Sequence, residues 1–287
     1  MHACTVLVAT ALLGASPFVR PQAELTPGYR AHETLQYQIT QSSRVQRHTG
    51  EGVQTMVASG FDIHIEPGDG SRSTVVASYT SFAVEIDNGV EVIRYSSSDP
   101  EWSNRQGERL APAVRAMLGT RLRMQVSRDG IASNLEMLDA PEFNDSRFIE
   151  TIVRPEALRR AFTQIFTVRC DVDTPDIGHT WTSSESNPMG NGIWAVTSFE
   201  STLRDIENEK ASIELRGEAS LVHPDPGTEL HQSIETRDIG GVLVWNIADG
   251  VLESARTHSD FDVVTPRGGL APDRTRLRQA SVIQRTR

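Results

Sequence analysis

The chain has 287 residues, a formal net charge of −10 and an apolar fraction of 38%, so it is long enough for one large β domain or two small ones with a packed core. Acidic residues and arginines are interspersed along it. This balance argues against a nucleic-acid-binding protein, for which a basic face is expected, and we predict no nucleic acid among its partners.

The first 23 residues fit a secretory signal peptide. The run Thr5–Ala15 is apolar and uncharged, and it is too short to span a bilayer. No Lys or Arg precedes this run, and no clean cleavage site follows it, so a misassigned start codon or a buried N-terminal segment remains an alternative. We expect an exported protein, in the periplasm or at the cell surface.

No other stretch approaches the roughly 20 apolar residues of a membrane helix, so we predict no transmembrane span in the mature chain. After removal of residues 1–23, Cys170 would be the one remaining cysteine, which excludes an intrachain disulfide. We interpret Cys170 as a packed small apolar residue, because the neighbouring sequence suggests no base that would activate a nucleophile.

Alternation of apolar and polar residues begins after residue 28. It predicts strands with one buried face near residues 35–41, 53–66, 76–87 and 90–97. Asn88-Gly89, Asp129-Gly130 and Asp249-Gly250 predict hairpins, since type I′ turns need positive φ at both central residues. Long strands of this kind favour a strongly curved sheet, because flat sheets of many strands are unusual.

Two segments have helical spacing. In the first, Leu110 to Leu118 are followed by Gly119 at the C′ position. The second begins at Pro155 and has an apolar stripe, which we expect to pack on a sheet face and not to stack on a cofactor: Leu158, Phe162, Ile165 and Phe166. A shorter helix is predicted around Phe148–Ile152.

A second strand block follows, near residues 193–203, 211–222, 229–247 and 251–264, and Gly240-Gly241 is expected to bend its third strand. The last predicted strand, 274–287, contains few apolar residues. We interpret it as an edge strand, whose arginines would discourage edge pairing: Arg274, Arg276 and Arg278.

The predicted fold class is mainly β (α+β): a long, curved antiparallel sheet or partly open barrel with two or three short helices packed on it. Residues 28–287 are expected to form a single β-rich domain. In an alternative organisation this domain has two similar halves, about 28–140 and 177–287, joined by a helical segment.

Motifs for hydrolase, phosphate-binding or dinucleotide-binding chemistry are absent from strand-to-helix turns of the sequence. Asp62, His64 and Glu66 alternate on one face of a strand, so two of them could bind one metal ion. Their other face is apolar, however, and a solvated face is the simpler interpretation. His179 lies beside Trp181, but a single imidazole without partners makes no site.

The other titratable pairs have ordinary interpretations. His223 and Asp225 flank a proline in a turn. The paired carboxylates Glu85/Asp87 and Asp260/Asp262 carry no specific signal in an acidic chain. We therefore predict no catalytic, cofactor-binding or metal-binding residues, and no cofactor.

Four features in a fixed order resemble one known family. They are the strand Tyr37–Gln41, the step from Leu118-Gly119 into the hairpin Val126–Gly130, the loop Ile177–Trp181 with its Gly-x-x-Trp element, and the Asp249-Gly250 hairpin. Together they resemble the DUF6263 family, which comprises exported bacterial proteins of unknown function. The resemblance covers most of the mature chain. It implies export and a β-rich fold, and it implies no activity and no catalytic residue.

A curved sheet with helices on its concave side can enclose an apolar cavity, and such cavities bind lipids or other apolar molecules. The alternative is that the helices fill the concavity. We predict a non-catalytic periplasmic or cell-surface binding module for an apolar ligand or lipid. The alternative function is a structural or protein-interaction component of the cell envelope, acting through exposed sheet edges or the arginine-bearing last strand.

Overall fold

The computed structural model describes residues 22–50, 52–68, 72–138, 155–190, 193–222, 232–267 and 270–287. Residues 1–21 of the expected signal segment lie outside the described residues. The predicted short helix at Phe148–Ile152 and the pair His223/Asp225 also lie outside them.

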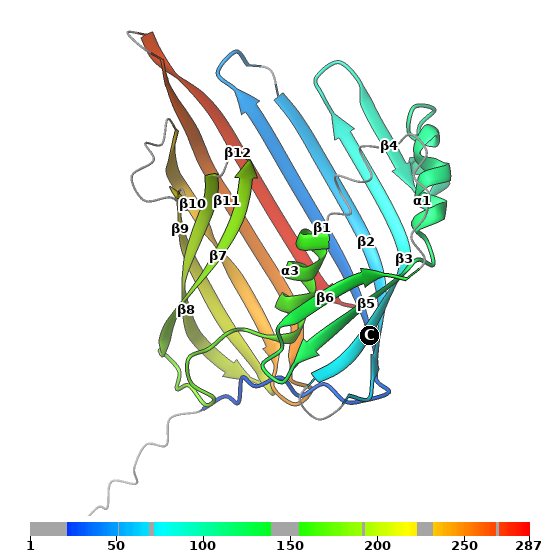
Figure 1. Ribbon diagram of the computed structural model, residues 1–287, viewed down its shortest axis with the longest axis vertical. Coiled ribbons are helices and arrows are strands. Elements are labelled where there is room, and N and C mark those ends of the chain that lie inside the picture. The colour runs from blue at the N-terminus through cyan, green and yellow to red at the C-terminus, as the bar shows by residue number, and fades with distance from the viewer. Residues whose placement is uncertain are drawn as a thin grey trace, which may run out of the picture.

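Within the described residues, twelve strands form one antiparallel sheet (Figure 1). Its order is β6-β5-β3-β2-β1-β12-β11-β10-β9-β8-β7, with β4 paired to β3. The sheet is not closed, and the predicted mainly β fold class is confirmed. The strands are β1 (Thr34–Arg47), β2 (Gly52–Glu66), β3 (Arg72–Asp87), β4 (Val92–Ser96), β5 (Arg121–Ser127), β6 (Ala132–Met137), β7 (Thr180–Gly190), β8 (Ile193–Glu207), β9 (Lys210–Val222), β10 (Ser233–Asn246), β11 (Val251–Arg267) and β12 (Leu270–Arg285).

The sheet curves into an open trough, and its two ends, β5–β6 and β7–β8, lie on either side of α3 (Pro155–Phe166) (Figure 1). A second helix, α1 (Ala111–Met117), follows the two short 3₁₀ turns Pro100–Trp102 and Gly107–Leu110. Both of these helices were expected from their spacing. Within the described residues, no helix is long and apolar enough to cross a membrane.

The helix α3 occupies the concave side of the sheet. Its apolar stripe is fully buried at Phe162, Ile165 and Phe166. Phe162 meets Phe61 of β2 edge-to-face with ring centroids 5.4 Å apart, and Phe166 meets Tyr29 in the same way at 5.1 Å. Since edge-to-face pairs are favourable beyond the area they bury, they fix the position of α3 against the sheet.

The last strand corrects one prediction. β12 is central, because it pairs with β1 on one side and with β11 on the other. The interpretation of residues 274–287 as an edge strand is therefore wrong. Cross-strand register is the physical reason: Arg276 lies opposite Asp262 and Arg278 opposite Asp260 on β11, so these arginines have carboxylate neighbours and their charge does not exclude pairing.

The predicted hairpins are present, but their turns are not type I′. Gly89, Gly130 and Gly250 have positive φ (79°, 77° and 59°), whereas the residues before them do not. The loop at Gly130 has three residues, with the amide of Gly130 donating to the carbonyl of Ser127 and the amide of Ser127 donating to that of Ile131. Such loops combine a type I turn with one left-handed residue. Two consecutive positive φ values occur instead at Asn208-Glu209, between β8 and β9.

Candidate functional site

The concave side beneath α3 is filled. The space left between α3 and strands β1–β3 is about 20 Å³, and Leu158 and Ala161 of the helix line it. That volume is sufficient for about one water molecule. Beneath α3, a filled core is therefore found, and the helix leaves no room for a ligand against these three strands.

A groove of about 1310 Å³ lies on the outer face of strands β8–β11, the face that points away from α3. It follows the line along which β9 and β10 part. The two strands pair from Gly240 opposite Arg216 to Asn246 opposite Lys210. Beyond Gly240, the hydroxyl of Thr236 bridges them by accepting from the amide of Ala219 (3.0 Å) and donating to its carbonyl (3.3 Å).

Glycines allow the close approach of chains at this point. A Cβ at Gly240 would lie 2.8 Å from the carbonyl oxygen of Leu215, and one at Gly217 would lie 2.6 Å from Cγ2 of Ile239. No register shift occurs at Gly240-Gly241 itself, where the sequence predicted an irregularity of β10. The shifts lie between Thr236 and Asp238 and between Val244 and Trp245. The absence of side chains at these glycines leaves backbone as the floor of the groove.

The groove combines charged and apolar side chains. Glu214 forms ion pairs with Arg204 and with Arg216, and hydrogen bonds from Arg204 hold the pKa of the Glu214 carboxyl below its usual value. Arg256 is exposed and has no ion-pair partner among the described residues. It faces Val242 across the β10–β11 register, and this valine is 44% exposed. The groove therefore offers a free guanidinium beside an apolar side chain.

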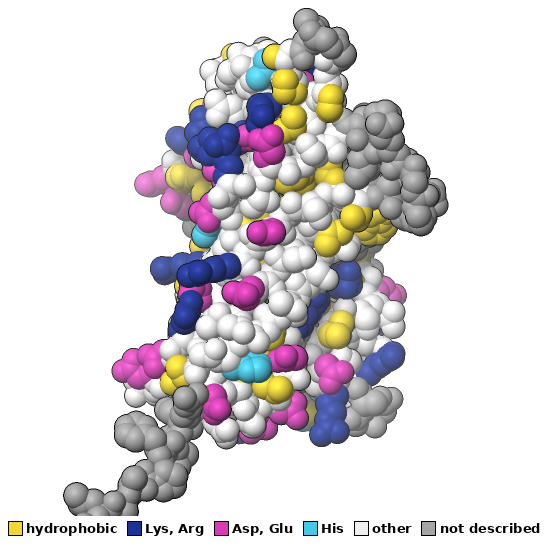
Figure 2. All heavy atoms as spheres, turned by 90° about the vertical axis from the view of Figure 1, so that its left-hand side faces the viewer, with side chains coloured by type: hydrophobic (Ala, Val, Ile, Leu, Met, Phe, Trp, Pro, Cys, Tyr) yellow, Lys and Arg dark blue, Asp and Glu magenta, His cyan; other side chains and the backbone are white. Residues whose placement is uncertain are grey.

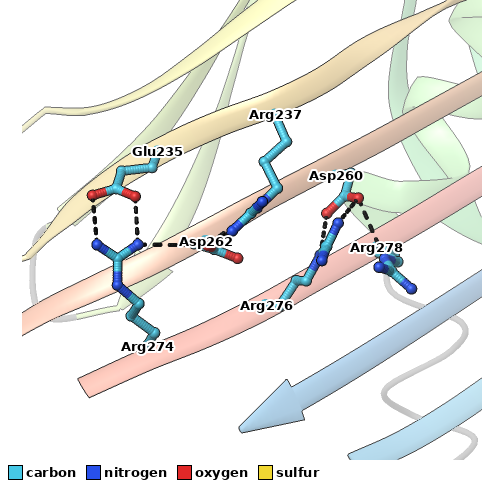
Figure 3. Close-up of polar contacts among 7 residues, drawn as sticks. All are labelled: Glu235, Arg237, Asp260, Asp262, Arg274, Arg276 and Arg278. Carbon is cyan, nitrogen blue, oxygen red and sulfur yellow. Dashed lines mark hydrogen bonds and ion pairs between the residues drawn. The ribbon is translucent and has the colours of Figure 1, made fainter. Parts of the chain in front are cut away.

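An arginine cluster lies on the same outer face, across β10–β12 (Figure 3). It consists of four guanidiniums and three carboxylates: Arg237, Arg274, Arg276, Arg278, Glu235, Asp260 and Asp262. Arg274 donates two hydrogen bonds to Glu235 (2.5 and 3.1 Å), and Arg276 donates two to Asp260 (2.8 and 2.5 Å). Asp260 and Asp262, which the sequence shows as a pair of carboxylates, thus lie opposite arginines of β12. This arrangement does not indicate acid–base chemistry.

Asp262 is the most enclosed member of the arginine cluster, with 4% of its side chain exposed. It accepts a hydrogen bond of 2.7 Å from Arg237, which the register shift in β10 places beside it, and it lies 3.6 Å from Arg274. Buried carboxylates need such partners, because an unpaired charge away from water is costly. The cluster is therefore largely satisfied internally, and it fixes the register of β10–β12.

Charged side chains are not spread evenly over the surface. Figure 2 shows dark-blue and magenta side chains side by side along the left margin and again over the lower part of this face, with white surface between them. Arginines and carboxylates that are close neighbours neutralise each other, and among the described arginines that line the groove, Arg256 is the one without an ion-pair partner.

The alternating residues of β2 do not form a metal site. Asp62 accepts a hydrogen bond from Gln36 (2.9 Å), and the Nδ1 atom of His64 lies 3.3 Å from the hydroxyl of Thr34. Asp62, His64 and Glu66 are not among the described groups that could share one ion. Glu85 is engaged by Arg94 at 2.6 Å. Asp62 is half-buried, and His64 and Glu66 are exposed.

His179 does have partners, contrary to its interpretation as an isolated imidazole. Its Nε2 atom lies 2.7 Å from Oδ1 of Asp171, and the Cys170 thiol lies 3.8 Å from the same oxygen. Sequence reasoning missed this cluster because a loop of seven residues separates Asp171 from His179. Burial raises the pKa of the Cys170 thiol, and the carboxylate lies next to both other groups, so an activated nucleophile is not indicated.

No protein-family model matches the chain, and no curated protein matches it. Among solved structures, it is similar to lipovitellin (9% identity, TM-score 0.38), with 90% of this chain and 25% of that chain covered. It is also similar to DynF from the dynemicin biosynthesis pathway of Micromonospora chersina (7% identity, TM-score 0.23; 98% and 92% covered) and to an outer membrane channel from Pseudomonas putida F1 (10% identity, TM-score 0.26; 91% and 97% covered). The chain thus spans a quarter of the lipovitellin chain, and likeness at these TM-scores carries no argument about function.

Proposed function

We propose that the protein is an exported, non-catalytic binding module whose outer groove takes an amphiphilic ligand, a lipid with an anionic head group. The observation that carries the proposal is the groove itself, which joins a guanidinium without a partner among the described residues to the exposed Val242 and the half-buried Val244 on a backbone floor. A lipid of this kind has an acyl chain for the apolar surface and an anion for the guanidinium.

The arrangement of side chains supports one orientation of the ligand. Val242 and Val244 lie on the β10 side of the groove, and Arg256 lies on β11. Glu218, an exposed carboxylate of the lining, has no ion-pair partner among the described residues. The other titratable groups are held in local pairs, with Glu214 bound to Arg204 and His258 lying 2.9 Å from Asp238. Arg256 is therefore the group that would meet an incoming anion.

Three probes test the proposal by calorimetry on the full chain: lysophosphatidylglycerol, monoacylglycerol and inorganic phosphate. The two lipids are used below their critical micelle concentrations. We expect the anionic lipid to bind most tightly. Arg256→Gln should weaken this binding about tenfold, as expected for loss of a charged hydrogen bond. Val242→Ser should weaken it about fivefold, because less apolar surface is buried.

Two matched variants lie outside the groove. Arg44→Gln removes another arginine that has no ion-pair partner among the described residues, and Val282→Ser removes another exposed valine, the residue opposite Arg256 on β12. Neither should change affinity. Equal binding of the neutral lipid or of free phosphate, or equal losses in the control variants, would contradict an amphiphile in this groove.

A second candidate is protein interaction through the sheet edge. Within the described residues β7 pairs with β8 alone, so one side of Thr180–Gly190 presents unpaired backbone groups to a partner strand. The arginine-bearing strand cannot play this role, because both of its sides are paired. Size-exclusion chromatography with light scattering tests for self-association through β7. Replacement of Ser184 by proline should reduce any such assembly, and an unchanged assembly would exclude this edge.

A further inference from the structure

We infer that Cys170, Asp171 and His179 form a binding site for a borderline-soft divalent cation of the Zn²⁺ type. Each residue offers a different ligand atom, and the thiol sulfur, the carboxylate oxygen and the ring nitrogen all lie within 4.8 Å of one another. Within the described part of the chain, this is the group of His, Cys, Asp and Glu side chains that is close enough to share an ion.

The separations suit a small tetrahedral cation. With bonds of about 2.0–2.3 Å to nitrogen, oxygen and sulfur, ligand atoms around Zn²⁺ lie about 3.3–3.7 Å apart. Here Oδ1 of Asp171 is 2.7 Å from Nε2 of His179 and 3.8 Å from the sulfur of Cys170. These distances lie on either side of the ideal values, so small side-chain rotations would admit the ion.

The imidazole is already held in place. The amide of His179 donates to the carbonyl of Asp176, and its own carbonyl accepts from the amide of Leu203 on β8. Its ring stacks on Trp181 with a centroid distance of 6.0 Å and an angle of 20°. The indole N–H of Trp181, which is buried, donates to the carbonyl of Val168. The ring therefore presents Nε2 toward the segment that carries the other two ligands.

The same stretch of chain fixes the other ligands. Cys170 and Asp171 lie on the segment that begins where α3 ends at Phe166. In this segment, the hydroxyl of Thr167 accepts a hydrogen bond from the amide of Arg169, which has a positive φ of 49°. A hydroxyl-capped turn of this kind is a local conformational constraint. An ion would therefore meet an imidazole held beside β7 and β8, and a thiol and a carboxylate on the loop that follows α3.

The donor set selects the class of cation. A thiolate with an imidazole favours Zn²⁺ and similar metals, whereas Mg²⁺ and Ca²⁺ prefer oxygen ligands alone. Three protein ligands leave a fourth position for water. Asp171 is 60% exposed, so an ion can reach the site from solvent.

The chain contains a matched control for an ordinary imidazole–carboxylate hydrogen bond. His258 lies 2.9 Å from Asp238, with both side chains exposed and no cysteine in the group. If His179 and Asp171 formed only such a pair, the two histidines would behave alike toward metals.

Cobalt titration of the full chain with reduced thiols tests the site, since Co²⁺ bound to a thiolate gives a charge-transfer absorption. The second cysteine of the sequence, Cys4, is replaced by serine in the background variant. We expect one equivalent of Co²⁺ to produce the band, and Zn²⁺ to displace it. Cys170→Ser should abolish the band, while His179→Gln should weaken Zn²⁺ binding at least about 100-fold, more than the usual effect of a second-shell change.

His258→Gln should leave both the band and the affinity unchanged. The inference is overturned if the Cys4→Ser protein gives no band, if the band survives Cys170→Ser, or if His258→Gln and His179→Gln lose affinity equally. Far-UV circular dichroism checks the fold of each variant. Should Cys170→Ser not fold, Asp171→Asn and His179→Gln, which keep the thiol, decide the question. Because the groove lies on β8–β11, lipid binding and metal binding can fail independently.

Discussion

Asp260 is a single residue whose hydrogen bonds on the outer face make stability depend on pH. It accepts two hydrogen bonds from Arg276 and one of 3.3 Å from Arg278, both on the neighbouring strand. The hydrogen bonds from Arg276 hold the pKa of the Asp260 carboxyl below its usual value. A carboxyl whose pKa is lowered by folding stabilises the native state only while it is ionised.

This gives a prediction for acid stability. The contribution of Asp260 is fully present above the unfolded pKa of about 3.9 and is lost as the pH falls through the lower folded pKa. Arg276→Gln should lower the free energy of unfolding at pH 7, and the difference from wild type should narrow below about pH 4. Urea denaturation of the wild type and Arg276→Gln at pH 7, 5, 4 and 3 measures this difference in the free energy of unfolding.

Arg123→Gln is the control, because Arg123 and Glu136 are exposed and 4.0 Å apart. Exposed pairs of this kind contribute little. We expect the control to match the wild type at every pH. A gap between Arg276→Gln and wild type that stays constant down to pH 3 would show that the Asp260 carboxyl is not the cause.

Two hairpin turns, β3–β4 and β5–β6, differ in how closely they pack against the rest of the protein. Gly89 and Gly130 both have positive φ in hairpin loops, but their surroundings differ. A Cβ at Gly89 would meet nothing within 4 Å, whereas one at Gly130 would lie 2.0 Å from the carbonyl oxygen of Phe166. The β5–β6 turn is thus packed against the end of α3, while the β3–β4 turn is free.

Alanine substitution should separate these two turns. Gly89→Ala should cost about 1 kcal/mol, the penalty for a left-handed alanine. Gly130→Ala should cost about 3 kcal/mol or more, because the turn and the end of α3 must also move apart. Thermal or urea unfolding measures both, and equal costs would mean that the contact between the β5–β6 turn and α3 adds nothing to stability.

At the scale of the whole molecule, β12 joins the two strand blocks. It pairs with β1 from the first block and with β11 from the second, so the blocks share one continuous sheet. The organisation as two similar halves remains a prediction, but any such halves would meet along the β1–β12 pair. Because both neighbours are present, each amide of a central strand can donate to one of them.

Proline in β12 tests this central position. Ala280 lies opposite Ser42 on one side and His258 on the other. Ala280→Pro removes a ladder hydrogen bond and should cost about 3 kcal/mol or more, whereas Ala280→Gly keeps the N–H and should cost about 1 kcal/mol. Urea denaturation compares the two, and similar costs would place Ala280 at a solvent-facing edge.

Local pattern was sufficient for much of the fold. Alternation located most of the strands, since Leu35, Tyr37 and Ile39 share one face in any sheet, and the stripe on Phe162 and Phe166 located α3. The strand β7, Thr180–Gly190, was not predicted. Position within the sheet was not predictable in this way. The arginines of β12 suggested an edge until the register placed Asp260 and Asp262 opposite them.

The candidate sites show the same division. The groove depends on where β9 and β10 separate, and the cluster at His179 depends on a loop returning to the end of α3; neither follows from the spacing of residues. The sequence by itself determined the two helices, the three hairpins with their glycines and most of the strands, because these arise from periodicity and turn residues close together along the chain. It did not predict β7 (Thr180–Gly190). Only the tertiary structure decided which strand is central, that α3 fills the space between itself and β1–β3, and which titratable groups meet, because these depend on contacts between residues far apart in sequence.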